Sequence, residues 1–152
     1  MSTDKNLSPF NFKYNREVKT YEVDFQHVVH NAIYFYYFEE ARIEYLKNLG
    51  FSIKGEITIS NSQFVVVHNQ ADYHEPARLG DMLEILVRMS KIGRSSFTYE
   101  MEIVREDGRH ICSGLTTVVT IDRENGHPKP IPESLRKSVE NFEGAALNAA
   151  AD

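Results

Sequence analysis

The segment from His30 to Leu49, HNAIYFYYFEEARIEYLKNL, restricts the fold of this chain more than any other. It contains no proline or glycine and is followed by Gly50, a residue type that commonly ends a helix, so we expect one long helix here. Five residues share one apolar face of this helix: Tyr34, Phe38, Ala41, Tyr45 and Leu49. Its first two turns are apolar on nearly all sides, and such a helix must be buried all round. This predicts a sheet on one side of the helix and a second subunit on another.

Arg42 lies within the apolar face of the predicted helix, where a buried guanidinium needs a partner. Glu39, three residues earlier, is the nearest carboxylate and is within reach on a helix. We expect these two side chains to form an ion pair that stabilises the helix.

Much of the remaining chain alternates between apolar and polar residues, which is typical of half-buried strands. A first strand is predicted at 12–23, before the helix. After a linker at 51–62, four more strands are predicted at 63–73, 83–90, 97–104 and 111–121. The turns at Gly93 and Asp107-Gly108 link the later strands as hairpins, so the sheet should be antiparallel.

Three prolines (Pro128, Pro130 and Pro132) then end the sheet, and a short helix is expected from Glu133 to Phe142. One antiparallel sheet wrapped around one long central helix is an α+β arrangement. We expect a single domain over residues 10–143 and a disordered or weakly helical tail over 144–152.

Length, charge and cysteine content narrow the class of protein. The chain has 152 residues, 41% hydrophobic and 26% charged, with a net charge of −5, which suits one globular domain and argues against a broadly basic nucleic-acid-binding surface. Cys112 is the only cysteine, so no intrachain disulfide can form. No segment has the apolar length of a signal peptide or a membrane span. We therefore expect a cytoplasmic protein with no nucleic-acid partner and no membrane span.

The loop entering the long helix, DFQHVVH, collects three side chains with reactive potential: Asp24, His27 and His30. The start of a helix offers unpaired backbone N–H groups that can hold an oxyanion, and a nearby carboxylate can act as base or nucleophile. Acyl transfer needs this pairing. By spacing alone, however, the signal is weak and favours the commoner role of Asp24 as a loop or capping aspartate.

Three segments of the chain resemble hotdog-fold acyl-CoA thioesterases of the 4-hydroxybenzoyl-CoA thioesterase type. The most specific is YEVDFQHVVHNAIYFYYFEEARIEYLKNLGFS, which is similar to the family's aspartate, short loop and "fEeaR.eyl..lG" helix. DYHEPARLGDMLEILVRMSKIGRSSFTYEMEI resembles the family's following strands, and IDRENGHPKPIPESLR its closing turn and helix. The resemblance covers roughly residues 12–142 and implies the hotdog fold.

The resemblance implies that Asp24 is the catalytic carboxylate, acting as general base on water or as nucleophile through a mixed anhydride. It implies that Asn31, where the helix begins, donates its backbone N–H to the thioester oxygen. His27, His30 and Tyr34 become candidates for substrate binding. His27 departs from the family, which often has glycine at this position, and glycine lets the backbone approach a substrate closely.

Other polar residues have less specific signals. Arg94, Ser95 and Ser96 follow the Gly93 turn, where the family commonly contacts the phosphates or pantetheine of coenzyme A; an ordinary solvated turn is the alternative. Asp24, His27 and His30 lack a further ligand at a recognisable metal spacing, so no metal or other cofactor is expected. His68 and His74 are expected to be ordinary strand histidines, and Cys112 a core thiol.

The favoured function is hydrolysis of an acyl-CoA thioester by a homodimer or homotetramer with its active site at a subunit interface. An acyl carrier protein is an alternative donor, although the −5 charge does not favour a strongly acidic partner. A hydratase of the same fold would need a catalytic histidine paired with a carboxylate from another motif, which the sequence does not reveal. A non-catalytic acyl-CoA-binding protein is the alternative from another class.

Overall fold

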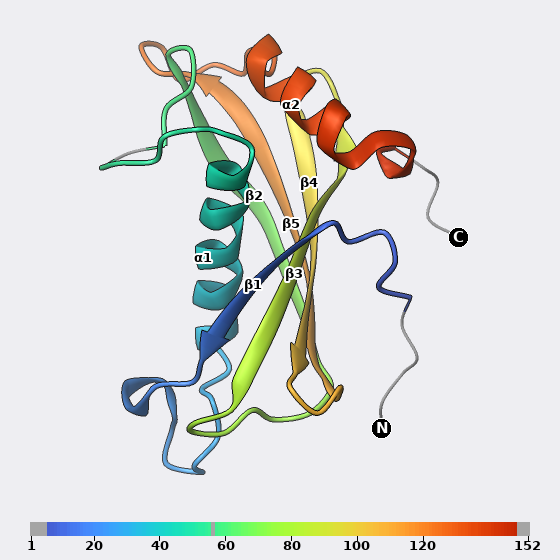
Figure 1. Cartoon of the computed structure of the whole chain (residues 1–152). Helices are drawn as coiled ribbons and strands as arrows, with labels where there is room; N and C mark the ends of the chain where they lie inside the picture. Colours follow the sequence, from blue (N-terminus) through green and yellow to red (C-terminus); the bar gives the residue numbers. More distant parts are fainter. Residues whose placement is uncertain (1–5, 56, 149–152) are drawn as a thin grey trace.

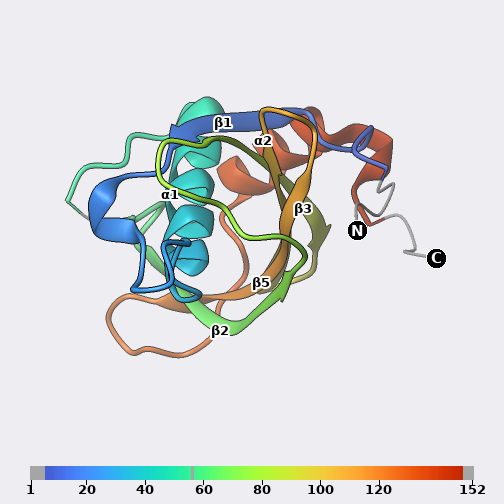
Figure 2. The ribbon, with the colours of Figure 1, turned by 90° about the horizontal axis from the view of Figure 1, so that it is seen from below.

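The computed structural model describes residues 6–55 and 57–148. Its elements follow the order β1 (Phe12–Glu17), η1 (Thr20–Glu22), α1 (Ile33–Asn48), β2 (Ser62–Tyr73), β3 (Met82–Ile92), β4 (Ser96–Arg105), β5 (His110–Asp122), α2 (Glu133–Glu143) and η2 (Gly144–Ala146). The strands form one antiparallel sheet in the order β1-β3-β4-β5-β2. The sheet curves around α1, and α2 lies across one end of it (Figure 1; Figure 2). The predicted α+β fold is confirmed.

The core lies between α1 and the concave face of the sheet. The inward residues of β3 are fully buried: Leu83, Ile85, Val87 and Met89. They alternate with partly exposed residues. Phe38 of α1 packs against β5 at Gly114, where a β-carbon would lie 2.5 Å from the ring. Helix and sheet therefore approach closely because this strand position has no side chain.

Helix α1 begins at Ile33, three residues later than predicted, and its stop at Gly50 is confirmed by the left-handed backbone of that residue (φ +99°). The buried side chains of α1 are Tyr34, Tyr37, Phe38, Ala41, Tyr45 and Leu46. Tyr36, in the apolar first turns, is 63% exposed. A single chain therefore leaves one side of the helix start uncovered.

Strand β1 is shorter than the sequence predicts because the chain turns away from the sheet after Glu17. Val18 is still held at the sheet end, donating its N–H to Asp81 O (2.9 Å) and accepting from Gly80 N (3.2 Å). The next residues form η1 instead of continuing the strand. Of the apolar residues at 18–23, Val18 is buried and Val23 partly buried, whereas Tyr21 is 78% exposed, so this pattern does not mark a continued strand.

Arg42 does not form the ion pair expected with Glu39. Its Nη1 donates to the Thr116 hydroxyl on β5 (3.2 Å), and its guanidinium carbon lies 5.9 Å from the centre of the Tyr99 ring. Burial lowers the pKa of Arg42, while the charge of Glu39 acts in the opposite direction without a direct contact. The partners of Arg42 therefore come from β4 and β5, which are distant from α1 in the sequence.

Strand β2 forms one edge of the sheet and is long for an edge strand. Val65, Val66 and Val67 on this edge are 42%, 42% and 57% exposed. Unprotected, apolar edge strands are templates for pairing with another chain. The β2 edge is therefore the surface of this molecule that most resembles an interface.

The segment after α2 starts with η2 and then contacts the sheet. Asn148 donates its backbone N–H to Ser90 O (2.8 Å), and its Oδ1 accepts from Ile92 N (2.9 Å). The rest of the expected tail, 149–152, lies outside the described residues. Within 6–55 and 57–148, no helix has the length and apolarity needed to cross a membrane.

Candidate functional site

The loop between η1 and α1 folds into a tight turn around Asp24. The backbone N–H of Asp24 donates to Val28 O (2.9 Å) and that of His27 to Asp24 O (3.0 Å). His27 has a φ of +64°, in the left-handed region that favours glycine. The turn therefore keeps a glycine-type backbone even though its residue is histidine.

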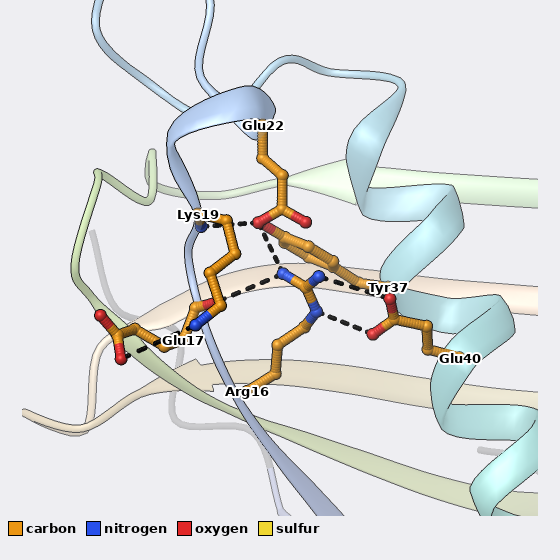
Figure 3. Close-up of polar contacts among 6 residues, drawn as sticks. All are labelled: Arg16, Glu17, Lys19, Glu22, Tyr37 and Glu40. Atoms are coloured by element: carbon orange, nitrogen blue, oxygen red, sulfur yellow. Dashed lines mark hydrogen bonds and ion pairs between the residues drawn. The ribbon is translucent and has the colours of Figure 1, made fainter.

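A buried polar network holds both ends of this loop, with Glu22 at its centre (Figure 3). Glu22 Oε1 accepts from Arg16 Nη1 (2.6 Å), the Lys19 backbone N–H (2.7 Å) and the Tyr37 hydroxyl (3.0 Å). The backbone oxygen of Glu22 accepts from His30 N at 2.9 Å, which ties the end of the loop to its beginning. Burial works to raise the pKa of Glu22, but these hydrogen bonds outweigh it and the pKa is lowered.

The loop and the end of β2 enclose an open cleft of about 580 Å³. Asp24, His30, Asn31 and Tyr34 line it from the loop and helix, and residues 73–76 line it from the end of β2 and the segment that follows. Asp24 Oδ1 accepts from Gln26 N (2.8 Å). In the described part of the chain its other oxygen, Oδ2, accepts no hydrogen bond. Asp24 therefore presents one fixed and one unoccupied carboxylate oxygen at the cleft.

The start of α1 supplies backbone donors to the same cleft. His30 Nδ1 accepts from Ala32 N at 3.1 Å, and Asn31 O accepts from the Tyr73 hydroxyl at 2.9 Å. Among residues 6–55 and 57–148 the Asn31 N–H finds no acceptor. Tyr34 is buried and its hydroxyl accepts from Ala77 N (3.2 Å), so it packs at the base of the cleft.

The structure does not bring every predicted site residue together. His27 is exposed and does not line the cleft. Arg94, Ser95 and Ser96 lie in or next to the β3–β4 turn, where Ile131 N donates to Arg94 O (2.9 Å). This turn is at the far end of β3 from the Asp24 loop, on the order of 30 Å away for a strand of this length. Within one chain these three residues do not meet the cleft.

His74 also lines the cleft, although the sequence suggests only an ordinary strand histidine. Its Nε2 lies 2.8 Å from Ser113 Oγ on β5, and Ser113 Oγ donates to Glu102 Oε2 (2.7 Å) on β4. Neither partner is near His74 in sequence. The only signal in the sequence for a role of His74 was its position directly after β2, the strand that ends beside the start of α1.

Metal and thiol chemistry find no support in the site geometry. No group of three or more His, Cys, Asp or Glu residues suited to hold a metal occurs in the part of the chain that the structure describes. Cys112 is fully buried, and burial raises the pKa of its thiol to about 12. It is a core thiol, as the sequence predicts.

A curved antiparallel sheet around one central helix, with a carboxylate cleft at the helix start, is the architecture of hotdog proteins. The family model described as "Thioesterase-like superfamily" matches residues 18–139. The chain belongs to this superfamily, which confirms the resemblance in its sequence.

Individual relatives agree. Over 127 residues the chain is 30% identical to "Long-chain acyl-CoA thioesterase FadM" of Escherichia coli, covering 83% of this chain and 95% of that protein. Over 124 residues it is 29% identical to "Acyl-CoA thioester hydrolase YbgC" of E. coli, covering 82% and 92%. A solved thioesterase from Thermus thermophilus, complexed with coenzyme A and Zn, has a TM-score of 0.75 and 30% identity over 91% of this chain and 98% of that one.

Proposed function

We propose that this protein hydrolyses acyl-CoA thioesters to a free acid and coenzyme A. One observation carries the proposal: Asp24, whose Oδ2 accepts no hydrogen bond in the described part of the chain, lines the same cleft as Asn31, whose backbone N–H precedes α1 without an acceptor there. Membership of the thioesterase-like superfamily, and the printed activities of the relatives, support this class of reaction. The cytoplasmic location expected from the lone cysteine is part of the same proposal.

The two groups have complementary roles in the reaction. Asp24 acts on the thioester carbonyl carbon, as general base for water or as nucleophile. The Asn31 N–H, at the positive end of the helix dipole, stabilises the oxygen that becomes negative. Glu22 and Arg16 hold the loop so that both groups keep their positions. Tyr34 and His30 shape the cleft around the substrate.

The proposal includes a homo-oligomer built on the β2 edge. Strand β2 runs toward the Asp24 loop, because the hydroxyl of Tyr73, its last residue, bonds Asn31 O. Two β2 strands paired antiparallel would place the β3–β4 turn of one copy at the Asp24 end of the other. Arg94, Ser95 and Ser96 would then reach the coenzyme A phosphates from the second copy.

The test is release of free thiol from a panel of acyl-CoAs and acyl carrier proteins, comparing wild type with Asp24→Asn. We expect the wild type to be active and the nearly isosteric variant to lose activity by roughly 10²–10⁴-fold. Light scattering on both proteins should give a dimer or tetramer. Full activity in Asp24→Asn would refute the role of Asp24, and binding of acyl-CoA without hydrolysis by wild type would favour a non-catalytic binding protein.

A further inference from the structure

A chain of four hydrogen-bonding residues runs from the cleft into the sheet: His74, Ser113, Glu102 and His110. Besides the contacts of His74 and Ser113 described above, His110 Nε2 lies 3.0 Å from Glu102 Oε2. The His74 and His110 rings meet edge to face, with centres 5.8 Å apart. Glu102 and His110 are buried, and of the four only His74 lines the cleft.

The hydrogen bonds determine where the protons lie. Ser113 Oγ donates its one proton to Glu102 Oε2. The Ser113 oxygen must then accept from His74, which places the imidazole proton on Nε2. A neutral His74 therefore has its lone pair on Nδ1. Over the described ranges Nδ1 has no hydrogen-bond partner.

One ring nitrogen of His74 is fixed by a buried serine and carboxylate, which sets the tautomer and ring orientation, and the other is left basic. This is the arrangement of an oriented general base. Asp24, which lines the same cleft, is a different kind of group with one oxygen that accepts no hydrogen bond in the described part of the chain.

We infer that His74 is a second catalytic residue, which deprotonates the water that releases the acyl group from Asp24. The inference rests on the proposed function and assigns Asp24 the role of nucleophile. Asp24 Oδ2 bonds to the thioester carbonyl carbon, the C–S bond breaks, and coenzyme A leaves as thiolate. Water then attacks the acyl carbon of the mixed anhydride, its proton moves to His74 Nδ1, and the bond to Asp24 breaks to restore the carboxylate. The proton on His74 passes to solvent.

Rapid-mixing measurement of thiol release tests this division of work. In His74→Gln, the first step is intact and the second is slow. We expect a burst of about one thiol per active site, followed by turnover about 10²-fold below wild type. Adding imidazole to His74→Gly should raise the slow phase without changing the burst. His127→Gln, altered at an exposed histidine in the turn after β5 that does not line the cleft, is the matched control and should behave as wild type.

The outcomes separate the two proposals. If wild type releases no thiol from any acyl-CoA, both fall. If wild type is active and Asp24→Asn is not, but His74→Gln turns over at the wild-type rate, only the role of His74 is wrong. Slow turnover of His74→Gln without a burst would also overturn it, because the step before thiol release would then be affected. Thermal melts of each variant check that the fold is retained.

Discussion

Replacing Gly114 by alanine should test the contact that sets the distance between α1 and the sheet. The added β-carbon would lie 2.5 Å from Cε2 and 2.6 Å from Cζ of Phe38. Non-bonded carbons prefer about 3.5–4.0 Å, so the ring would have to move by about 1 Å. Phe38 is 1% exposed, so its ring lies within the core and not at the surface.

Overpacking of this kind costs about 1–3 kcal/mol, and the reduced entropy of the unfolded chain returns about 0.4–1 kcal/mol. We therefore expect Gly114→Ala to lower the free energy of unfolding by about 1–2 kcal/mol. For a domain of this size that corresponds to a fall in Tm of roughly 2–8 °C. The assay is urea unfolding of wild type and variant at one protein concentration.

A double-mutant cycle identifies the cause. Phe38→Leu shortens the ring that meets the new methyl group, so the two substitutions together should cost at least about 0.5 kcal/mol less than their sum. Gly93→Ala is the control, because its β-carbon would come no nearer than 3.4 Å to Ser96 O. A neutral Gly114→Ala, or strictly additive energies with Phe38→Leu, would refute the steric explanation.

Two further predictions concern the loop of the site. His27→Gly should leave stability within about 1 kcal/mol of wild type and activity unchanged, whereas His27→Val should cost about 1–2 kcal/mol of stability because a β-branched residue resists the left-handed backbone. Urea unfolding measures the stability of both variants, and kcat/KM measures their activity. Lost activity in His27→Gly would mean that the imidazole takes part in the reaction. Glu22→Gln should cost about 2 kcal/mol at pH 7 through its weakened bonds to Arg16. The pKa of Glu22 is lowered in the folded protein, so the stability difference between wild type and Glu22→Gln should be fully present above the ordinary pKa of 4.5 and shrink as pH falls through the folded pKa. A stability difference independent of pH would contradict the view that the Glu22 carboxylate stabilises the fold through these bonds.

Local pattern predicts most of this fold. The alternation of Leu83, Ile85 and Val87 gives β3 its inward face without any knowledge of its neighbours, and Gly50 ends α1 where expected. The end of β1 is different, because hydrogen bonds between Glu22 and Arg16 help turn the chain into η1, and no local pattern contains that pairing. The same reason explains why Arg42 meets Thr116 and not Glu39.

The candidate site divides in the same way. Asp24, His30 and Asn31 lie within one short segment, so their shared position at the helix start follows from sequence. The left-handed backbone of His27 was indicated only through the family's glycine, and its absence from the cleft lining was not indicated. His74 could not be separated from an ordinary histidine, since Ser113 and Glu102 reach it only through the pairing of β2, β4 and β5.

The strand order also decides when the cleft can exist during synthesis. Phe12 of β1 pairs with Val87 of β3, and β2 pairs with β5. Strands β1 and β2, which flank α1 in the sequence, therefore lack their pairing partners when the helix leaves the ribosome. Contacts between segments so far apart in sequence form slowly, because their loops must close first. His74 is therefore translated well before Ser113 on β5, which fixes its imidazole. A chain truncated before β5 would carry Asp24 and His74 and yet lack the serine that orients the imidazole.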